Sequence, residues 1–283
     1  MGSMHPAPAP TLVVLLHGLR GNAAQMAGVA ALAHVAIPGA AVLSPEYRAR
    51  TFSNADAGAV AAEIDREIER YHTHWRARHV VLVGYSIGAE LLRRAYLDAR
   101  ERGAAWVSGV DRLVLIAGVR GGWSMTPPPR RMPPRTRIAI AFGHRLARIA
   151  GIGRLARAFE RGAPFTADLD ARWAALDTRG AAPAVVELFG DRDDVLTWDG
   201  GGELATRRRV IIRVRRSTHR DILAVDARPE GSDPATWRSP DDPRRERRSV
   251  LRAALVGSPT ELRGLARRRA PREIIPLDAT ARG

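Results

Sequence analysis

A serine between two glycines stands where an apolar run ends, in the stretch "VVLVGYSIGAELL" that begins at residue 80. The G-x-S-x-G spacing around Ser86 is typical of a strand that turns sharply into a helix and leaves the serine hydroxyl exposed at the turn. Gly84 and Gly88 would leave room there for two backbones to cross. The pattern alone also fits an ordinary strand-to-helix turn, but the apolar run before it and the helical spacing after it favour a nucleophile.

A serine nucleophile needs a histidine base and an acid that orients the histidine. In the chain order that accompanies this motif, the acid follows the serine and the histidine comes last. The turn "GDRDDV" at 190–195 offers Asp191, Asp193 and Asp194 as candidate acids, and His219 is the only one of the eight histidines beyond that turn. His219 is therefore the predicted base.

The stretch "LLHGLRGN" closes the first predicted strand with His17 and Gly18. A loop in this position can offer a backbone N–H to the carbonyl oxygen under attack, and we assign that donor to Leu19. The second donor is the N–H of Ile87, which follows the serine. A purely structural glycine turn is the alternative for this segment taken alone.

Other catalytic chemistries find little support in the chain. It contains no cysteine, which excludes disulfides, thiolate zinc sites and a cysteine nucleophile. The histidines of "HTHWRARH" at 72–79 have no paired carboxylates nearby, so we interpret them as a surface cluster. We expect neither a metal nor a cofactor.

Apolar runs bounded by turn residues predict buried parallel strands, with helix-period stretches between them. These runs are "LVVLL" (12–16), "VVLV" (80–83), "LVLI" (113–116) and "AVVEL" (184–188). The stretch "RVIIRVR" (209–215) alternates instead, which is typical of a strand near a sheet edge. Alternating strands and helices indicate the α/β class, with a mostly parallel central sheet flanked by helices.

We expect one domain over residues 1–283, with a helical cap or lid inserted at 120–173. The segment 227–283 is predicted to be a polar loop followed by a helical extension, in which Val250, Leu251 and Leu255 pack against the sheet. The insertion contains a basic amphipathic helix that could be a packed cap, a mobile lid or a contact with a lipid surface. Its apolar stripe is Ile138, Phe142, Leu146 and Ile149, beside Arg137, Arg145 and Arg148.

The formal net charge is +15, and all 45 basic residues are arginines spread from residue 20 to residue 282. Such a distribution fits a compositional bias better than a dedicated polyanion site, although an anionic membrane surface is a candidate partner. No nucleic-acid-binding motif is present, so no specific nucleic acid partner is expected. The first residues lack a secretory pattern, which favours a cytoplasmic location; a signal peptide removed before Met4 is the alternative.

Four ordered pieces of the chain, "HGLRGN", "GYSIG", "GDRDD" and "STHRDI", resemble the α/β-hydrolase superfamily between about residues 12 and 225. More loosely, "RGGW" and "GAPFTADLDARW" are similar to bacterial lipases and esterases related to inositol-deacylase-type lipases. The resemblance implies the α/β-hydrolase fold, Ser86 as nucleophile and His219 as general base and acid. It implies Asp193 as the acid, since family members place it three residues after the glycine that closes the strand, with Asp194 as the rival.

Two departures from the family pattern concern the elbow and the sheet. Tyr85 stands before the serine, where many members carry histidine, and the sheet begins directly at the His-Gly strand, which implies a reduced sheet. The resemblance implies a serine hydrolase that cleaves carboxylic esters, small or lipid-like, through an acyl-enzyme. A thioesterase or acyltransferase with the same triad, or a non-catalytic protein that binds through its basic surface, are the alternatives.

Overall fold

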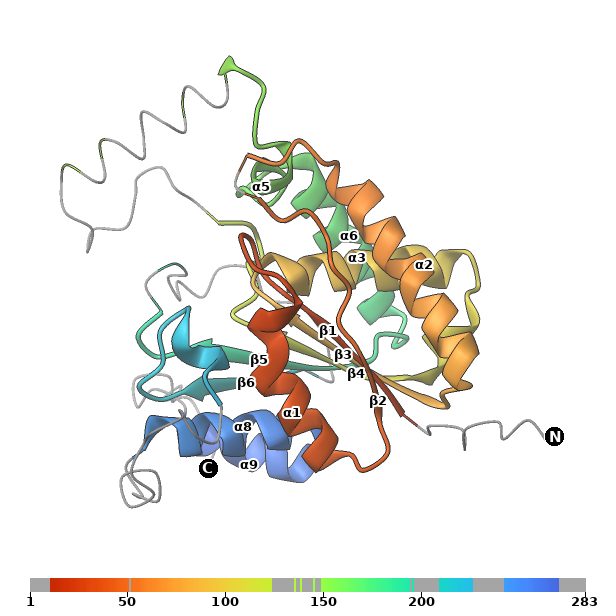
Figure 1. Ribbon diagram of the computed structural model, residues 1–283, viewed down its shortest axis with the longest axis vertical. Coiled ribbons are helices and arrows are strands. Elements are labelled where there is room, and N and C mark those ends of the chain that lie inside the picture. Colours follow the sequence, from red (N-terminus) through yellow and green to blue (C-terminus); the bar gives the residue numbers. More distant parts are fainter. Residues whose placement is uncertain are drawn as a thin grey trace, which may run out of the picture.

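The computed structural model describes residues 11–50, 52–123, 149–193, 209–225 and 242–269, together with Arg135, Ile138, Arg145 and Val195. Its described strands form one six-stranded sheet in the order β2-β1-β3-β4-β5-β6, and every neighbouring pair is parallel. Helices cover both faces of this sheet (Figure 1). The fold class predicted from the alternating pattern is confirmed.

The strands are β1 (Thr11–Leu16), β2 (Ala41–Leu43), β3 (His79–Tyr85), β4 (Val110–Ile116), β5 (Ala184–Gly190) and β6 (Arg209–Val214). The α-helices are α1 (Ala27–Ala36), α2 (Ala57–Trp75), α3 (Ile87–Glu101), α5 (Arg154–Ala158), α6 (Pro164–Thr178), α8 (Pro243–Val256) and α9 (Pro259–Arg269). Short 3₁₀ helices cover Ala23–Met26, Ala105–Gly109 and Asp221–Leu223.

Two hydrophobic layers enclose the sheet, because successive side chains of a strand point to opposite faces. In β1, Leu12 and Val14 belong to the hydrophobic layer that contains residues of α2, α3 and α6, whereas Val13 and Leu15 belong to the layer that contains residues of α1, α8 and α9. The same alternation continues through β3, β4 and β5. Both faces are therefore buried, as the continuous apolar runs predicted for parallel strands.

The predicted strands all occur, and β6 lies at a sheet edge, as its alternating pattern indicated. The opposite edge strand, β2, was missed. It spans only three residues, "AVL", within a longer stretch of small apolar residues that also suits a helix or a loop. Its pairing with β1 depends on a neighbour that is distant in the sequence, and local spacing does not reveal such a contact.

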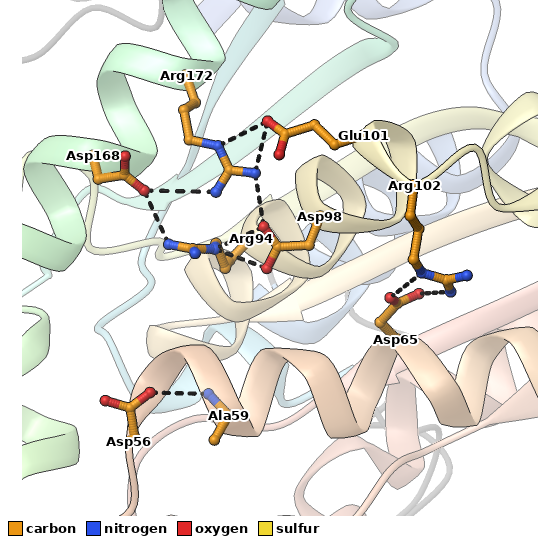
Figure 2. Close-up of polar contacts among 9 residues, drawn as sticks. All are labelled: Asp56, Ala59, Asp65, Arg94, Asp98, Glu101, Arg102, Asp168 and Arg172. Atoms are coloured by element: carbon orange, nitrogen blue, oxygen red, sulfur yellow. Dashed lines mark hydrogen bonds and ion pairs between the residues drawn. The ribbon is translucent and has the colours of Figure 1, made fainter.

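A network of ion pairs joins α3 to α6 (Figure 2). Arg94 Nε lies 2.8 Å from Asp98 on its own helix, and Arg94 Nη1 lies 3.0 Å from Asp168 on α6. From α6, Arg172 forms ion pairs of 2.7 Å with Asp98 and 3.0 Å with Glu101. Shared arginines make such a network more effective than isolated surface pairs. It links α6 to α3, the helix that begins directly after Ser86.

The two ends of the predicted insertion pack on the body of the protein. Leu169 and Trp173 of α6 are fully buried in the layer that contains α3, and α5 contacts the loop after β2 through a bond of 3.1 Å from Leu155 N to Ser53 O. The middle of the insertion lies mostly outside the described residues, so the lid stays a prediction. In the C-terminal segment, Val250, Leu251 and Leu255 of α8 are buried, as predicted.

Candidate active site

Ser86 lies between the end of β3 and the start of α3, with φ 54° and ψ −126°. A positive φ is strained for any residue with a side chain, and such strain often marks functional turns. A Cβ on Gly84 would lie 2.6 Å from Ala89 N, and a Cβ on Gly88 would lie 2.7 Å from Leu16 O. The room that both glycines were predicted to leave for crossing backbones is therefore confirmed.

His219 bridges Ser86 and Asp193. Its Nε2 lies 3.2 Å from Ser86 Oγ, and its Nδ1 lies 3.0 Å from Asp193 Oδ2. Ser86 and His219 are less than one tenth exposed, and the Asp193 side chain is buried as well. The structure thus brings the three residues together in one hydrogen-bonded row, although they are distant in the sequence.

The three aspartates of the turn after β5 differ in what they contact. Asp193 Oδ2 faces His219, while its Oδ1 accepts a hydrogen bond of 2.9 Å from Val195 N, which fixes the plane of the carboxylate. Asp191 instead accepts from Ser217 N at 3.1 Å. Asp194, the rival of Asp193, lies outside the described residues.

We call residues 215–220, which carry His219, the base loop. Its position against the turn after β5 requires a glycine, since a Cβ on Gly190 would lie 2.7 Å from the carbonyl carbon of Ser217. Arg192 N donates to Ser217 O at 2.9 Å. Backbone contacts between neighbouring strand ends therefore hold Asp193 and His219 at their separation.

Arg247 of α8 binds the base loop, and the sequence did not predict this role. Its Nε donates to Ser217 Oγ at 2.9 Å, its Nη2 donates to Arg216 O at 2.7 Å, and it forms an ion pair of 3.1 Å with Asp221. The side chain is almost completely buried. In the sequence Arg247 stands in the arginine-rich run "PRRERR", where nothing marks one arginine as different from the others.

The two predicted N–H donors lie at the starts of the turn after β1 and of α3. Ile87 is the first residue of α3, where a backbone N–H has no partner within the helix. In the turn, Gly18 N donates to Gln25 Oε1, Arg20 N donates to Ala49 O, and Gly21 N donates to Gly18 O. The backbone N–H of Leu19 lies between the N–H groups of Gly18 and Arg20, both of which already donate hydrogen bonds.

His17 is fully buried at the start of that turn, and its ring stacks on Tyr47 with centroids 4.2 Å apart. Tyr47, another residue that sequence reasoning missed, donates its hydroxyl hydrogen to His17 O at 2.7 Å. Burial lowers the pKa of the His17 imidazole, while a hydrogen bond to the Gly18 carbonyl and the charge of Glu46 act in the opposite direction. His17 is a structural support of the turn.

This lowered pKa predicts a loss of stability in mild acid. The ordinary pKa of a histidine is about 6.5. Below that pH, the unfolded chain binds a proton at His17 that the folded protein does not yet bind, and this difference favours unfolding. The contribution of neutral His17 to the free energy of unfolding is fully present above pH 6.5 and is lost as the pH falls toward the folded-state pKa. Urea unfolding of wild type and His17→Gln between pH 8 and pH 5 should show a steeper decline for wild type. Parallel curves would contradict the prediction.

Within the described part of the chain, no group of three or more histidine, aspartate or glutamate side chains could hold a metal ion. No described helix is both long and apolar enough to cross a membrane. His79, at the end of the predicted surface cluster, is exposed and contacts Asp111 at 2.9 Å. The expectation that no metal or cofactor is needed stays a prediction.

Solved structures with the same architecture include several hydrolases. Phospholipase PlaB from Legionella pneumophila aligns with TM-score 0.60 and 12% identity over 92% of this chain, which spans 64% of the phospholipase. The Pyrobaculum calidifontis esterase aligns with TM-score 0.56 and 18% identity over 89% of this chain and 78% of its own. The Bacillus licheniformis lipase BlEst2 gives 0.53 and 16%, over 79% and 90% of the two chains.

The chain therefore has the α/β-hydrolase fold, as its motifs implied. A family model described as "Bacterial virulence protein (VirJ)" matches residues 13–119. That match runs from β1 to just beyond β4, so it includes Ser86 but neither Asp193 nor His219. Among curated proteins, none matches the sequence.

Proposed function

We propose that this protein is a serine hydrolase that cleaves carboxylic esters through an acyl-enzyme. The observation that carries the proposal is the row of hydrogen bonds from Ser86 through His219 to Asp193, with separations of 3.2 Å and 3.0 Å. A strained serine at a strand-to-helix turn, paired with a buried imidazole, is the arrangement in which a serine hydroxyl becomes a nucleophile.

In the first half of the proposed reaction, Ser86 Oγ attacks the ester carbonyl carbon while His219 Nε2 takes the hydroxyl proton. Asp193 accepts a hydrogen bond from His219 Nδ1–H, so it selects the tautomer whose Nε2 is free to act as a base. The same carboxylate stabilises the imidazolium that forms. His219 then gives its proton to the leaving alkoxide, and the acyl group stays on Ser86.

In the second half, a water molecule attacks the acyl-enzyme while His219 Nε2 again removes a proton. Collapse of this tetrahedral intermediate releases the carboxylic acid, and the proton returns to Ser86 Oγ. In both halves a negative charge develops on the former carbonyl oxygen. We assign its stabilisation to the N–H groups of Leu19 and Ile87, the second of which also benefits from the dipole of α3.

The test combines substrate turnover with labelling of the nucleophile. Purified protein is given p-nitrophenyl esters of increasing acyl length, and a fluorophosphonate probe is located by peptide mass spectrometry. We expect hydrolysis of at least one ester and a single adduct on the peptide that contains Ser86. Absence of both turnover and label at every chain length would refute the hydrolase proposal, and salt-dependent binding to polyanions would then favour the binding-protein alternative.

We also propose that the substrate is presented at an anionic lipid surface. Arg135, Ile138, Arg145 and Ile149 are helical and exposed, and their spacings of three, seven and four residues are those of one helix face. The two isoleucines are more than 70% exposed, and Phe52, on the loop that contacts α5, is 67% exposed. Apolar side chains between arginines complement anionic headgroups, and the net charge of +15 acts in the same direction.

Vesicle sedimentation tests this second proposal. We expect binding to phosphatidylcholine vesicles that contain phosphatidylserine, weaker binding at high salt, and little binding to phosphatidylcholine alone. Ile149→Ser should weaken the binding severalfold. The matched control is Val35→Ser, because Val35 on α1 is equally exposed at 76% but lies on another part of the surface. Equal binding to neutral vesicles, or equal losses in both variants, would contradict the proposal.

A further inference from the structure

Tyr85 lies directly before Ser86 as the last residue of β3, and its side chain points to the sheet face opposite to α3. It is almost completely buried there, with 4% exposure. The strand alternation that places Gly84 against α3 places the phenol under the loops at the carboxyl edge of the sheet. A tyrosine at this position can therefore reach groups that the serine elbow itself does not touch.

The phenol contacts the base loop at the residue that carries the imidazole. Tyr85 Oη donates a hydrogen bond of 2.8 Å to His219 O, and the two rings lie 5.3 Å apart at 41°. This bond spans 134 positions of the sequence and ends on the backbone of His219 itself. It therefore fixes the backbone segment from which Nε2 must reach Ser86.

The other side of the same ring faces the turn after β1. A Cβ on Gly18 would lie 2.9 Å from Tyr85 Cδ1 and Cε1, and 3.0 Å from Ser86 Cβ. The ring thus fills the space between the turn that holds Leu19 and the loop that holds His219. The Tyr85 side chain therefore contacts the backbone of His219, the proposed base, and lies against Gly18, which precedes Leu19, the proposed oxyanion donor.

A core-filling role would need only the ring, whereas the hydroxyl makes a specific bond to one carbonyl. We propose that Tyr85 is a positioning residue, whose hydroxyl sets the alignment of His219 Nε2 with Ser86 Oγ. This inference rests on the proposed hydrolase function. It assigns no chemical step to the phenol, which acts entirely through the base loop.

The test is Tyr85→Phe, which keeps the ring and removes the hydroxyl. Because a single hydrogen bond is lost, we expect kcat to fall about five- to tenfold with KM within about twofold. The rate of fluorophosphonate labelling should fall by the same factor, since it depends on the same alignment. The matched control is Tyr96→Phe: Tyr96 is equally buried but lies on α3 among Trp106 and Trp173, away from the base loop.

A merely structural role would lower the melting temperature in both variants but leave kcat and the labelling rate within twofold of wild type, and that result would overturn the inference. A second readout does not need turnover: the proton between His219 Nδ1 and Asp193 gives a downfield NMR resonance. We expect this resonance to shift or broaden in Tyr85→Phe and to stay in place in Tyr96→Phe. An unchanged resonance in Tyr85→Phe would overturn the inference, whereas an inactive and unlabelled wild type would refute the hydrolase proposal instead.

Discussion

Replacement of Ser86 by alanine is expected to lower ester turnover by about four to six orders of magnitude, as removal of a triad member does elsewhere. Alanine has no atom that could form the acyl-enzyme, and it removes the Oγ that lies 3.2 Å from His219 Nε2. The free energy of unfolding should change little, because the positive φ at this turn strains the backbone of alanine and of serine to a similar extent. Turnover at saturating p-nitrophenyl ester, together with a thermal melt, checks both statements.

The control is Ser108→Ala, an exposed serine whose hydroxyl bonds only locally, to Ala105 O at 2.8 Å. It should retain wild-type turnover. Because Ser86 and His219 act as a unit, the double variant Ser86→Ala/His219→Ala should be no slower than either single variant. A residual rate above about one hundredth of wild type in Ser86→Ala, or additive losses in the double variant, would argue against a covalent mechanism.

Replacement of Glu187 by alanine is expected to cost about 3–5 kcal/mol of unfolding free energy, the size of effect seen when one partner of a buried ion pair is removed. Glu187 of β5 is fully buried, and its Oε2 lies 3.0 Å from both Arg120 Nη1 and Arg209 Nη2. Burial lowers the pKa of the Arg120 guanidinium, and the Glu187 carboxylate raises it. Without that carboxylate, the guanidinium groups of Arg120 and Arg209 would lose their shared counter-charge in a place with little water.

Urea unfolding measures this cost, since the free energy extrapolates linearly to zero denaturant. Glu187→Gln should lose less than Glu187→Ala, because the amide oxygen still accepts hydrogen bonds from the arginines. The matched control is Glu67→Ala, which removes the exposed pair with Arg70 at 3.9 Å and should change stability by less than about 1 kcal/mol. A loss in Glu187→Ala as small as in that control would mean that the other interactions of the two arginines compensate for the lost carboxylate.

The sequence predicted that Ser86, His219 and Asp193 would lie together, and the hydrogen-bonded row of these three residues has a physical reason. In a parallel sheet the carboxyl ends of all strands meet at one edge, so turns that follow β3, β5 and β6 converge whatever their separation in the chain. The resemblance implied Asp193 from its place three residues after Gly190, and in the structure Asp193 Oδ2 lies 3.0 Å from His219 Nδ1. Sheet topology explains why the three turns meet, whereas the choice of Asp193 among the aspartates of its turn came from the resemblance to the α/β-hydrolases.

Contacts between distant segments could not be predicted in the same way. Arg247 and Tyr47 support the base loop and the first turn, yet each looks like any other arginine or tyrosine in its local sequence. Likewise, the burial of Trp173 against α3 was not predicted, because exposed alanines such as Ala167 and Ala171 spread apolar residues around α6 and weaken its apolar stripe. Such side chains acquire their role from partners that only the folded chain supplies.

The base loop is held by α8 as well as by the sheet, since Arg247 binds Arg216 and Ser217 within the loop and Asp221 directly after it. In the described part of the chain, β6 pairs with one strand, β5, and the terminal helices α8 and α9 pack on its face. Local opening of such a region requires less free energy than global unfolding. Loss of activity on heating should therefore begin at a lower temperature than loss of the helical circular-dichroism signal. The half-life of the activity would then depend on how firmly α8 stays packed against the base loop.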